Sequence, residues 1–85
     1  MPTISRFQQM KIEMFFEDHN PPHFHVRFDK KNNICLLDGS LHLGALPAEQ
    51  RKLVKEWAAL HAAALFDNWN LCLRGEHPNE IPGLE

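Results

Sequence analysis

The stretch HNPPHFHVRF, residues 19–28, predicts a tight turn followed by a strand with one apolar face. Asparagine followed by two prolines favours a turn, because the asparagine side chain bonds to nearby backbone and each proline fixes its φ angle. We expect the Asn20–Pro21 peptide bond to be trans, the commoner form. The six residues after the turn alternate between apolar and polar side chains, as in a half-buried strand. The residues expected to face the core are Phe24, Val26 and Phe28, and those on the opposite face are His23, His25 and Arg27.

The same two-residue period extends to both sides of this stretch. In MKIEMFF, residues 10–16, the even positions are apolar, which predicts a strand before the turn. KKNNICLLDGSLHL, residues 30–43, predicts a strand, a tight Asp-Gly turn and a short final strand. PTISRF, residues 2–7, predicts one more strand. We therefore expect residues 1–46 to form an antiparallel sheet of four to five short strands.

After Pro47 the apolar residues recur every three or four positions, which predicts an amphipathic helical segment over residues 47–74. The residues on this stripe are Leu53, Val54, Trp57, Leu60, His61, Ala64, Leu65, Asn68 and Trp69. Asp67 is an alternative start for a separate short helix. Residues 75–85 are rich in proline and glycine and predict an irregular tail. The expected fold is a single α+β domain over residues 1–85, with a C-terminal helix packed on one face of the sheet.

The composition indicates a small globular domain and excludes some classes of function. The chain has 85 residues and a formal net charge of −2, which argues against strong non-specific binding to nucleic acid. Its first residues lack the pattern of a secretory signal, and no apolar run is long enough to span a membrane. We therefore expect a cytoplasmic protein with no membrane association. Cys35 and Cys72 are expected to be buried thiols and not a disulfide, because they lie far apart in a chain expected to be cytosolic and because they form no Cys-x-x-Cys pair.

His23 and His25 give the sharpest chemical signal. Side chains two residues apart on a strand share a face, with Cα atoms roughly 6.5 Å apart, so two imidazoles can converge on one atom. Three interpretations stay open: a solvated polar face, acid–base or anion-binding chemistry with Arg27, or a divalent metal site. A metal would need a third ligand, for which His19 and Asp18 are the nearest candidates.

His61 and Asn68 lie on the apolar stripe of the predicted helix. His61 is interpreted either as a buried histidine of the core or as a pocket residue, and Asn68 could orient a substrate or the imidazole ring. If the helix packs on Phe24 and its neighbours, His23 and His25 face away from His61. Trp57 and Trp69 are expected to anchor the core, as their place on the stripe indicates.

Five stretches resemble the small bacterial family known as domain of unknown function 4160, or DUF4160: PTISRF, DHNPPHFHV, LVKEWAALH, LFDNWNL and IPGLE. The resemblance implies a compact α+β domain in cytosolic bacterial proteins, often encoded beside a partner of the DUF2442 family in a toxin–antitoxin-like pair. The family pattern falls on His19, Pro21, Pro22, His23, His25, Trp57, His61, Asn68 and Trp69. Segment 29–44 and the helix start PAEQRK depart from that pattern.

Two hypotheses of function follow. The first is a toxin-like enzyme that cleaves RNA without a metal or other cofactor. In it His23 and His25 act as acid and base, His19 or His61 assists, and the substrate contacts are Arg27 and Asn68. The alternative is a non-enzymatic module that binds a protein partner, such as the DUF2442-like neighbour. A variant of either hypothesis adds a divalent metal, zinc for example, with His19, His23 and His25 as candidate ligands.

Overall fold

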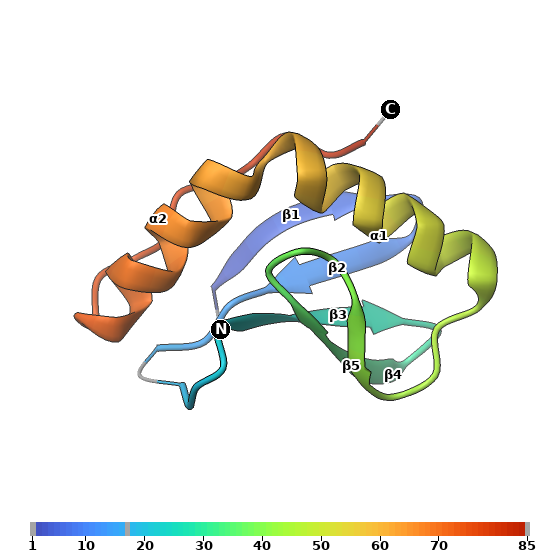
Figure 1. Cartoon of the computed structure of the whole chain (residues 1–85), viewed down its shortest axis with the longest axis horizontal. Coiled ribbons are helices and arrows are strands. Elements are labelled where there is room, and N and C mark those ends of the chain that lie inside the picture. Colours follow the sequence, from blue (N-terminus) through green and yellow to red (C-terminus); the bar gives the residue numbers. More distant parts are fainter. Residues whose placement is uncertain (1, 17, 85) are drawn as a thin grey trace.

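The computed structural model describes residues 2–16 and 18–84 and has the predicted α+β architecture, a five-stranded antiparallel sheet followed by two helices (Figure 1). The elements are β1 (Thr3–Phe7), β2 (Met10–Glu13), β3 (His23–Phe28), β4 (Lys31–Leu36), β5 (Leu41–Leu43), α1 (Ala48–Leu60) and α2 (Ala62–Leu73). The strands lie in the sheet in the order of the sequence. The predicted single domain also includes Met1, Glu17 and Glu85, which lie outside the described residues.

Short turns set the order of the strands. Gln8 and Gln9 connect β1 to β2, and Asp29 and Lys30 connect β3 to β4, with all four residues at positive φ. Two consecutive residues at positive φ match the right-handed twist of the paired strands, so each pair forms a tight hairpin. The connection between β2 and β3 is longer and contains the predicted turn, in which the Asn20–Pro21 bond is cis and not trans as predicted.

The helical segment is divided at His61, so that two helices replace the single helix predicted for residues 47–74. His61 has φ −118° and ψ 27°, which lie outside the helical range. Its N–H still donates to the Trp57 carbonyl, and its own carbonyl accepts from the Leu65 N–H. The chain therefore changes direction while His61 keeps both of its backbone hydrogen bonds, and Figure 1 shows the two helices running in different directions.

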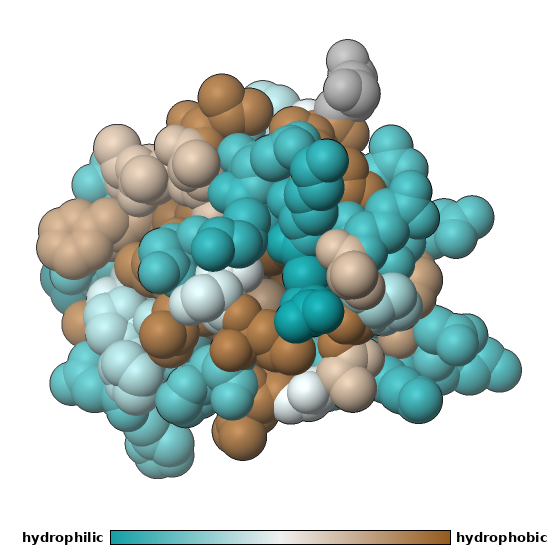
Figure 2. All heavy atoms as spheres, turned by 45° about the vertical axis from the view of Figure 1, so that its right-hand side comes forward, coloured by the Kyte–Doolittle hydropathy of each residue, from teal (hydrophilic) through white to brown (hydrophobic). Residues whose placement is uncertain are grey.

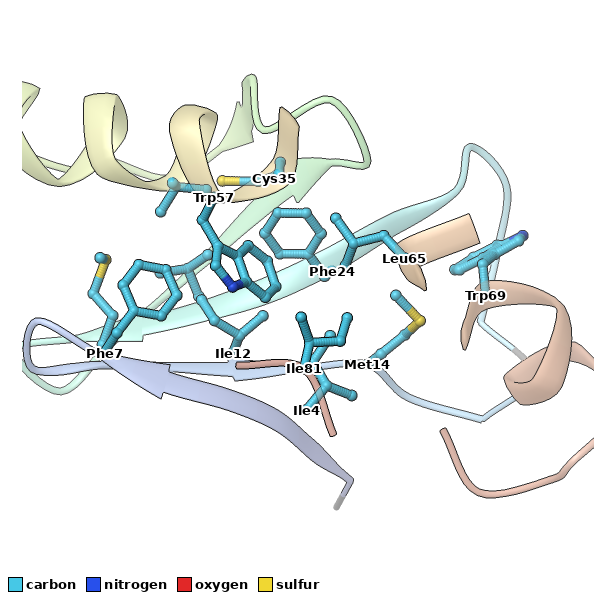
Figure 3. Packing of buried hydrophobic residues seen from close by; sticks show 14 of the residues in the cluster. Ile4, Phe7, Ile12, Met14, Phe24, Cys35, Trp57, Leu65, Trp69 and Ile81 are labelled. Carbon is cyan, nitrogen blue, oxygen red and sulfur yellow. The ribbon is translucent and has the colours of Figure 1, made fainter. Parts of the chain in front are cut away.

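The core lies between the sheet and the helices (Figure 3). Trp57 of α1 is completely buried, and its ring lies 5.6 Å from Phe24 and 5.3 Å from Phe7. The predicted role of the two tryptophans as core anchors is confirmed, since Trp69 of α2 is also buried. The other buried apolar residues are Ile4, Met10, Ile12, Met14, Val26, Cys35, Leu46, Val54, Ala58, Leu65, Cys72 and Ile81.

Both cysteines are buried free thiols, as predicted. Burial raises the pKa of the Cys35 thiol to about 11, and the Asp38 carboxylate adds to the shift. Burial also raises the pKa of Cys72, whose thiol lies 3.8 Å from the carbonyl oxygen of Met14. Both thiols therefore stay protonated at neutral pH and are poor nucleophiles.

The tail after α2 is irregular, as predicted, but specific contacts hold it against the domain. The N–H of Ile81 donates to the Ile4 carbonyl of the edge strand β1 at 2.7 Å. The indole N–H of Trp57 donates to the Pro82 carbonyl at 2.9 Å. Ile81 is buried with the core, so the tail covers one edge of the sheet.

The surface mixes polar and apolar side chains. Figure 2 shows apolar residues interspersed among hydrophilic ones on the face that it presents. The large apolar residues that are exposed come from several elements: Phe16, Leu43, Leu60, Phe66 and Leu73. Within residues 2–16 and 18–84, neither helix has the length and apolar character that crossing a membrane requires.

Candidate functional site

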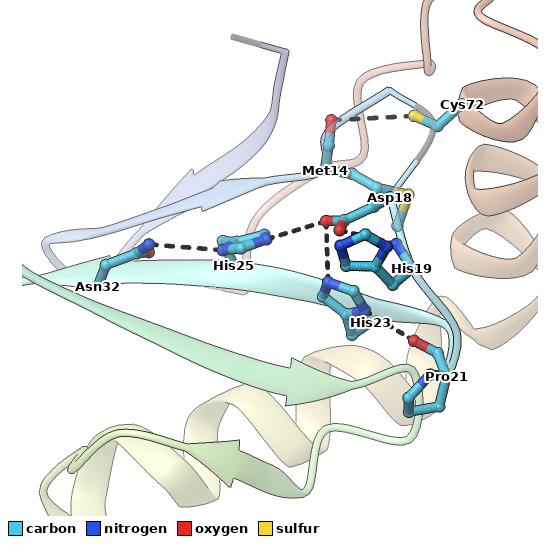
Figure 4. A network of polar contacts seen from close by, with 8 residues as sticks. All are labelled: Met14, Asp18, His19, Pro21, His23, His25, Asn32 and Cys72. Carbon is cyan, nitrogen blue, oxygen red and sulfur yellow. Dashed lines mark hydrogen bonds and ion pairs between the residues drawn. The ribbon is translucent and has the colours of Figure 1, made fainter.

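Strand β3 carries His23 and His25 two positions apart, on the same face of the sheet. A solvated polar face was one interpretation of this spacing, and for the histidines it is wrong. Only 9% of the His23 side chain and 11% of the His25 side chain are exposed. The cause is the connection between β2 and β3, which folds back and places Asp18 against both rings (Figure 4). Arg27, the next residue on this face, is exposed.

The two imidazole rings converge on one carboxylate oxygen. Asp18 Oδ2 lies 2.9 Å from His23 Nε2 and 3.3 Å from His25 Nε2. The ligand atoms of the three residues all lie within 4.8 Å of one another. Asp18, His23 and His25 are the one group of three such residues that could hold a metal ion within the part of the chain that the structure describes, and we call them the Asp-His-His cluster.

The carboxyl group of Asp18 is held in its charged form. Burial by itself raises the pKa of Asp18, but the hydrogen bond from the His19 backbone N–H outweighs it together with the two histidines, which favour the carboxylate whenever their Nε2 atoms carry a proton, so the pKa lies below its ordinary value. The His19 N–H donates to Oδ1 at 2.8 Å. One oxygen is thus bound to the backbone, and the other is directed at the histidines.

His23 is oriented by its second ring nitrogen. Nδ1 lies 2.7 Å from the carbonyl oxygen of Pro21. A carbonyl can only accept, so Nδ1 carries the proton and donates it. In neutral His23 the lone pair is therefore on Nε2, which is directed at the Asp18 carboxylate. Two electron-rich atoms at 2.9 Å repel each other unless Nε2 is protonated or a cation binds both.

His25 is fixed mainly by packing. Its ring lies edge-on to Phe15, with centroids 4.2 Å apart, and 5.3 Å from the ring of His23. Its Nδ1 faces the side-chain amide of Asn32 on β4 at 3.5 Å, which is a long and weak contact. Trp69 of α2 lies 5.4 Å from the His23 ring. Both imidazoles are thus held in place by aromatic neighbours, so their Nε2 atoms already point at one oxygen.

A shallow pocket of about 210 Å³ lies beside the cluster. The turn, β3, β4 and β5 all contribute to it. Its lining residues are Asp18, His19, Asn20, Pro21, His23, His25, Ile34, His42 and Leu43. A group bound at the cluster would therefore be accessible from outside the protein.

A family model described as "Domain of unknown function (DUF4160)" matches residues 10–70, which is more than half of the chain. The chain belongs to this family. The match confirms the resemblance inferred from the sequence, and it includes all three residues of the Asp-His-His cluster. None of the curated proteins and none of the solved structures matches the chain. Because DUF4160 has no assigned function, the case for a function rests on the site itself.

In this DUF4160 domain, His19 lies next to the cluster without joining it. Its side chain is exposed on the turn, and its contribution to the cluster is the backbone N–H that binds Asp18. The third member of the cluster is therefore Asp18, the other candidate considered from the sequence. Arg27 lies at the far end of β3, where it pairs with Lys11 and Asn32 in the sheet register.

His61 and Asn68 lie in the helical layer. His61 is partly exposed, and its ring is 5.9 Å from that of Trp57, which packs on the Phe24 side of β3. Among the described residues, no contact joins His61 to His23 or His25. The Asn68 amide donates to the Asn79 carbonyl at 2.9 Å and accepts from the Asn79 N–H at 2.8 Å. Asn68 therefore holds the tail through both its side-chain nitrogen and its side-chain oxygen.

Sequence reasoning missed the groups that surround the two histidines. The Pro21 carbonyl fixes the His23 tautomer, and Phe15 and Asn32 contact the His25 ring. The Asn32 contact arises from the pairing of β3 with β4, and hairpin register was the one signal in the sequence that could have predicted it. The Phe15 contact depends on how the long connection folds, which no periodicity encodes.

Proposed function

We propose that this DUF4160 domain binds a divalent metal ion through the Asp-His-His cluster, and that zinc is the ion that suits the cluster best. The observation that carries the proposal is the orientation of His23. Its Nδ1–H is bound to the Pro21 carbonyl, so the lone pair of Nε2 is directed at Asp18 Oδ2. Histidines that bind metals typically donate their other N–H in this way to a carbonyl or carboxylate. In neutral His23 the contact is repulsive until a proton or a metal cation lies between the two atoms, and the proposal is that a metal ion takes this place and binds both.

The distances support the same conclusion. Ligand atoms that bind zinc at about 2.05 Å in a tetrahedron lie about 3.3 Å apart. The Asp18 oxygen is 2.9 Å from one imidazole nitrogen and 3.3 Å from the other. Small side-chain shifts would therefore admit the ion. Two imidazoles and one carboxylate are a ligand set that suits zinc, and three protein ligands leave one position for water or another molecule.

Titration calorimetry of protein made without a histidine tag tests the proposal. We expect one zinc ion per chain, and His23→Gln and His25→Gln should each weaken binding by at least about 100-fold. His77→Gln is the matched control, because His77 is exposed and its ring packs against Phe16 outside the cluster. Equal zinc affinity in all four proteins would overturn the proposal.

RNA cleavage without a metal is the second candidate function. The observation that favours it is the pocket, which His19, His25 and His42 line together. Cleavage through the 2′-hydroxyl needs one imidazole to accept a proton and another to donate one. A chelator tests this second candidate, because cleavage by histidines alone does not need an ion. Metal-independent cleavage continues in EDTA and stops in His25→Ala, whereas RNA that stays intact with wild-type protein in EDTA argues against it.

The association with a DUF2442-like neighbour is also a proposal, made from the family resemblance. Three apolar side chains exposed on the two helices support it: Leu60, Phe66 and Leu73. Co-expression with the tag on the neighbour tests it, and we expect the two chains to elute together. Phe66→Ser should weaken the complex, whereas Lys52→Ser should not, because Lys52 is a charged exposed residue. Separate elution of the wild-type chains would contradict the proposal.

A further inference from the structure

We infer that the pocket beside the Asp-His-His cluster binds a small carboxylate that carries an apolar group, with the carboxylate on the metal. This inference rests on the proposed metal site. Asp18, His23 and His25 all line the pocket, so the free coordination position of a three-ligand ion has its access from there. The site thus has room for a ligand from solution beside its metal ligands.

The floor of the pocket is apolar. His25 pairs with Ile34, and Ile34 pairs with Leu43 in the register of β3, β4 and β5. Directly paired residues share a face of the sheet, so the side chains of Ile34 and Leu43 continue the row that begins at His25. Helix α1 packs on the other face, where Trp57 contacts Phe24. Trp69 of α2 lies beside His23 and is not among the residues that line the pocket. This row is therefore open to a ligand, and 59% of Leu43 is exposed.

The charge of the site selects an anion. A divalent ion with the single Asp18 carboxylate keeps one net positive charge, because the two imidazoles are neutral ligands. None of the described residues that line the pocket is Lys or Arg, the side chains that usually compensate a phosphate. A ligand with one negative charge therefore fits better than inorganic phosphate.

Two further histidines of the pocket can bind the carboxylate group of the ligand. His19 and His42 stand beside the cluster, and each can donate an N–H to the carboxylate oxygen that does not bind the metal. A hydrocarbon or aromatic group on the ligand would then cover Ile34 and Leu43, which removes apolar surface from water. A volume of about 210 Å³ admits a group of the size of a benzene ring but no extended chain.

Two sources could supply this chemistry, a free carboxylic acid or the C-terminal residue of a peptide. Zinc-loaded protein is titrated with benzoate, acetate, inorganic phosphate and acetyl-glycyl-leucine. We expect benzoate to bind at least about tenfold more tightly than acetate or phosphate, because its ring is buried. If the peptide binds at least as tightly as benzoate, the source is a chain terminus. If benzoate binds more tightly, it is a free acid.

Leu43→Ser tests the role of the apolar floor. Leu43 is largely exposed, so the variant should fold and keep its zinc affinity while losing at least about threefold in benzoate affinity. Leu60→Ser is the matched control, since 70% of this leucine is exposed on α1. Benzoate affinity that is unchanged in Leu43→Ser, equal to that of acetate, or independent of zinc would overturn the inference.

The zinc affinity of the same samples separates the two proposals. Protein that binds zinc but none of the carboxylates overturns the carboxylate inference and leaves the metal site intact. Protein that binds no zinc overturns both, because the inferred ligand needs the ion. Apparent zinc affinity that rises with benzoate and not with acetate supports both, since two ligands that bind together strengthen each other reciprocally.

Discussion

On one face of β3, Phe24 and Val26 are completely buried in the apolar core, whereas on the other face His23 and His25 are buried by the connection between β2 and β3, with Trp69 of α2 beside His23. The apolar side is stabilised by many non-directional contacts, and no single one of them depends on an exact angle. The polar side depends on a few directional contacts that meet at one Asp18 oxygen. A change on the first face should therefore affect folding, and a change on the second should affect the binding of a ligand.

The largest expected effect comes from breaking the apolar face at Trp57. Trp57→Ala should lower the free energy of unfolding by about 3–5 kcal/mol, because it leaves a cavity and removes the hydrogen bond to the Pro82 carbonyl. Urea denaturation measures the loss. Leu60→Ala on the same helix is the control, with a change within about 0.5 kcal/mol because Leu60 is exposed. If Trp57→Ala does not fold, Trp57→Phe gives a smaller loss that can be measured. If Trp57→Phe and Leu60→Ala are equally stable, the prediction that the apolar face of β3 determines folding is wrong.

The second prediction breaks the polar face and leaves the apolar face intact. Asp18→Asn should weaken zinc binding by about 100-fold or more, because it removes the charged ligand. The fold should persist, since the new amide can accept from the His19 N–H and donate to His23 Nε2. Calorimetry and circular dichroism measure the two properties. Lost structure, or retained zinc affinity, would show that the two faces do not divide their roles as we describe.

A smaller effect is expected where Asn68 holds the tail. Asn68→Ala removes both hydrogen bonds to Asn79 and should cost about 2 kcal/mol of stability. Asn70→Ala on the same helix is the control, because Asn70 contributes its backbone carbonyl to the helix end. Zinc affinity should stay unchanged in both variants. If Asn68→Ala loses zinc affinity and Asn70→Ala does not, Asn68 contributes to the metal site.

The smallest effect is the pH dependence of metal-free protein. The pKa of Asp18 is lowered in the folded state, so its contribution to stability is present above the ordinary carboxyl pKa of 3.8 and disappears as the pH falls through the lowered value. The stability difference between wild type and Asp18→Asn should therefore change in acid below about pH 4. Urea denaturation from pH 6 to pH 3 measures it. A difference that is constant over this range would contradict the lowered pKa.

The sequence predicted the local structure because local structure depends on periodicity. The two-residue alternation of β3 and the three-to-four-residue period after Pro47 determine which side chains can reach a core. The antiparallel strands and the buried tryptophans followed from the same reasoning and are confirmed, and so are the free thiols, which were inferred from the spacing of the cysteines. The separation of the helix at His61 was missed, because a change of direction leaves the apolar spacing of the sequence in place.

By itself the sequence determined that His23 and His25 share a face of a strand, and it named Asp18 as one candidate to join them. The tertiary structure decided that this face is buried and that Asp18, not the His19 side chain, meets both rings. In the tertiary structure Asn68 forms hydrogen bonds with the tail, and His61 lies in the helical layer beside Trp57. The physical reason is that alternation specifies the direction of a side chain, whereas its partner depends on how loops and distant segments fold over it.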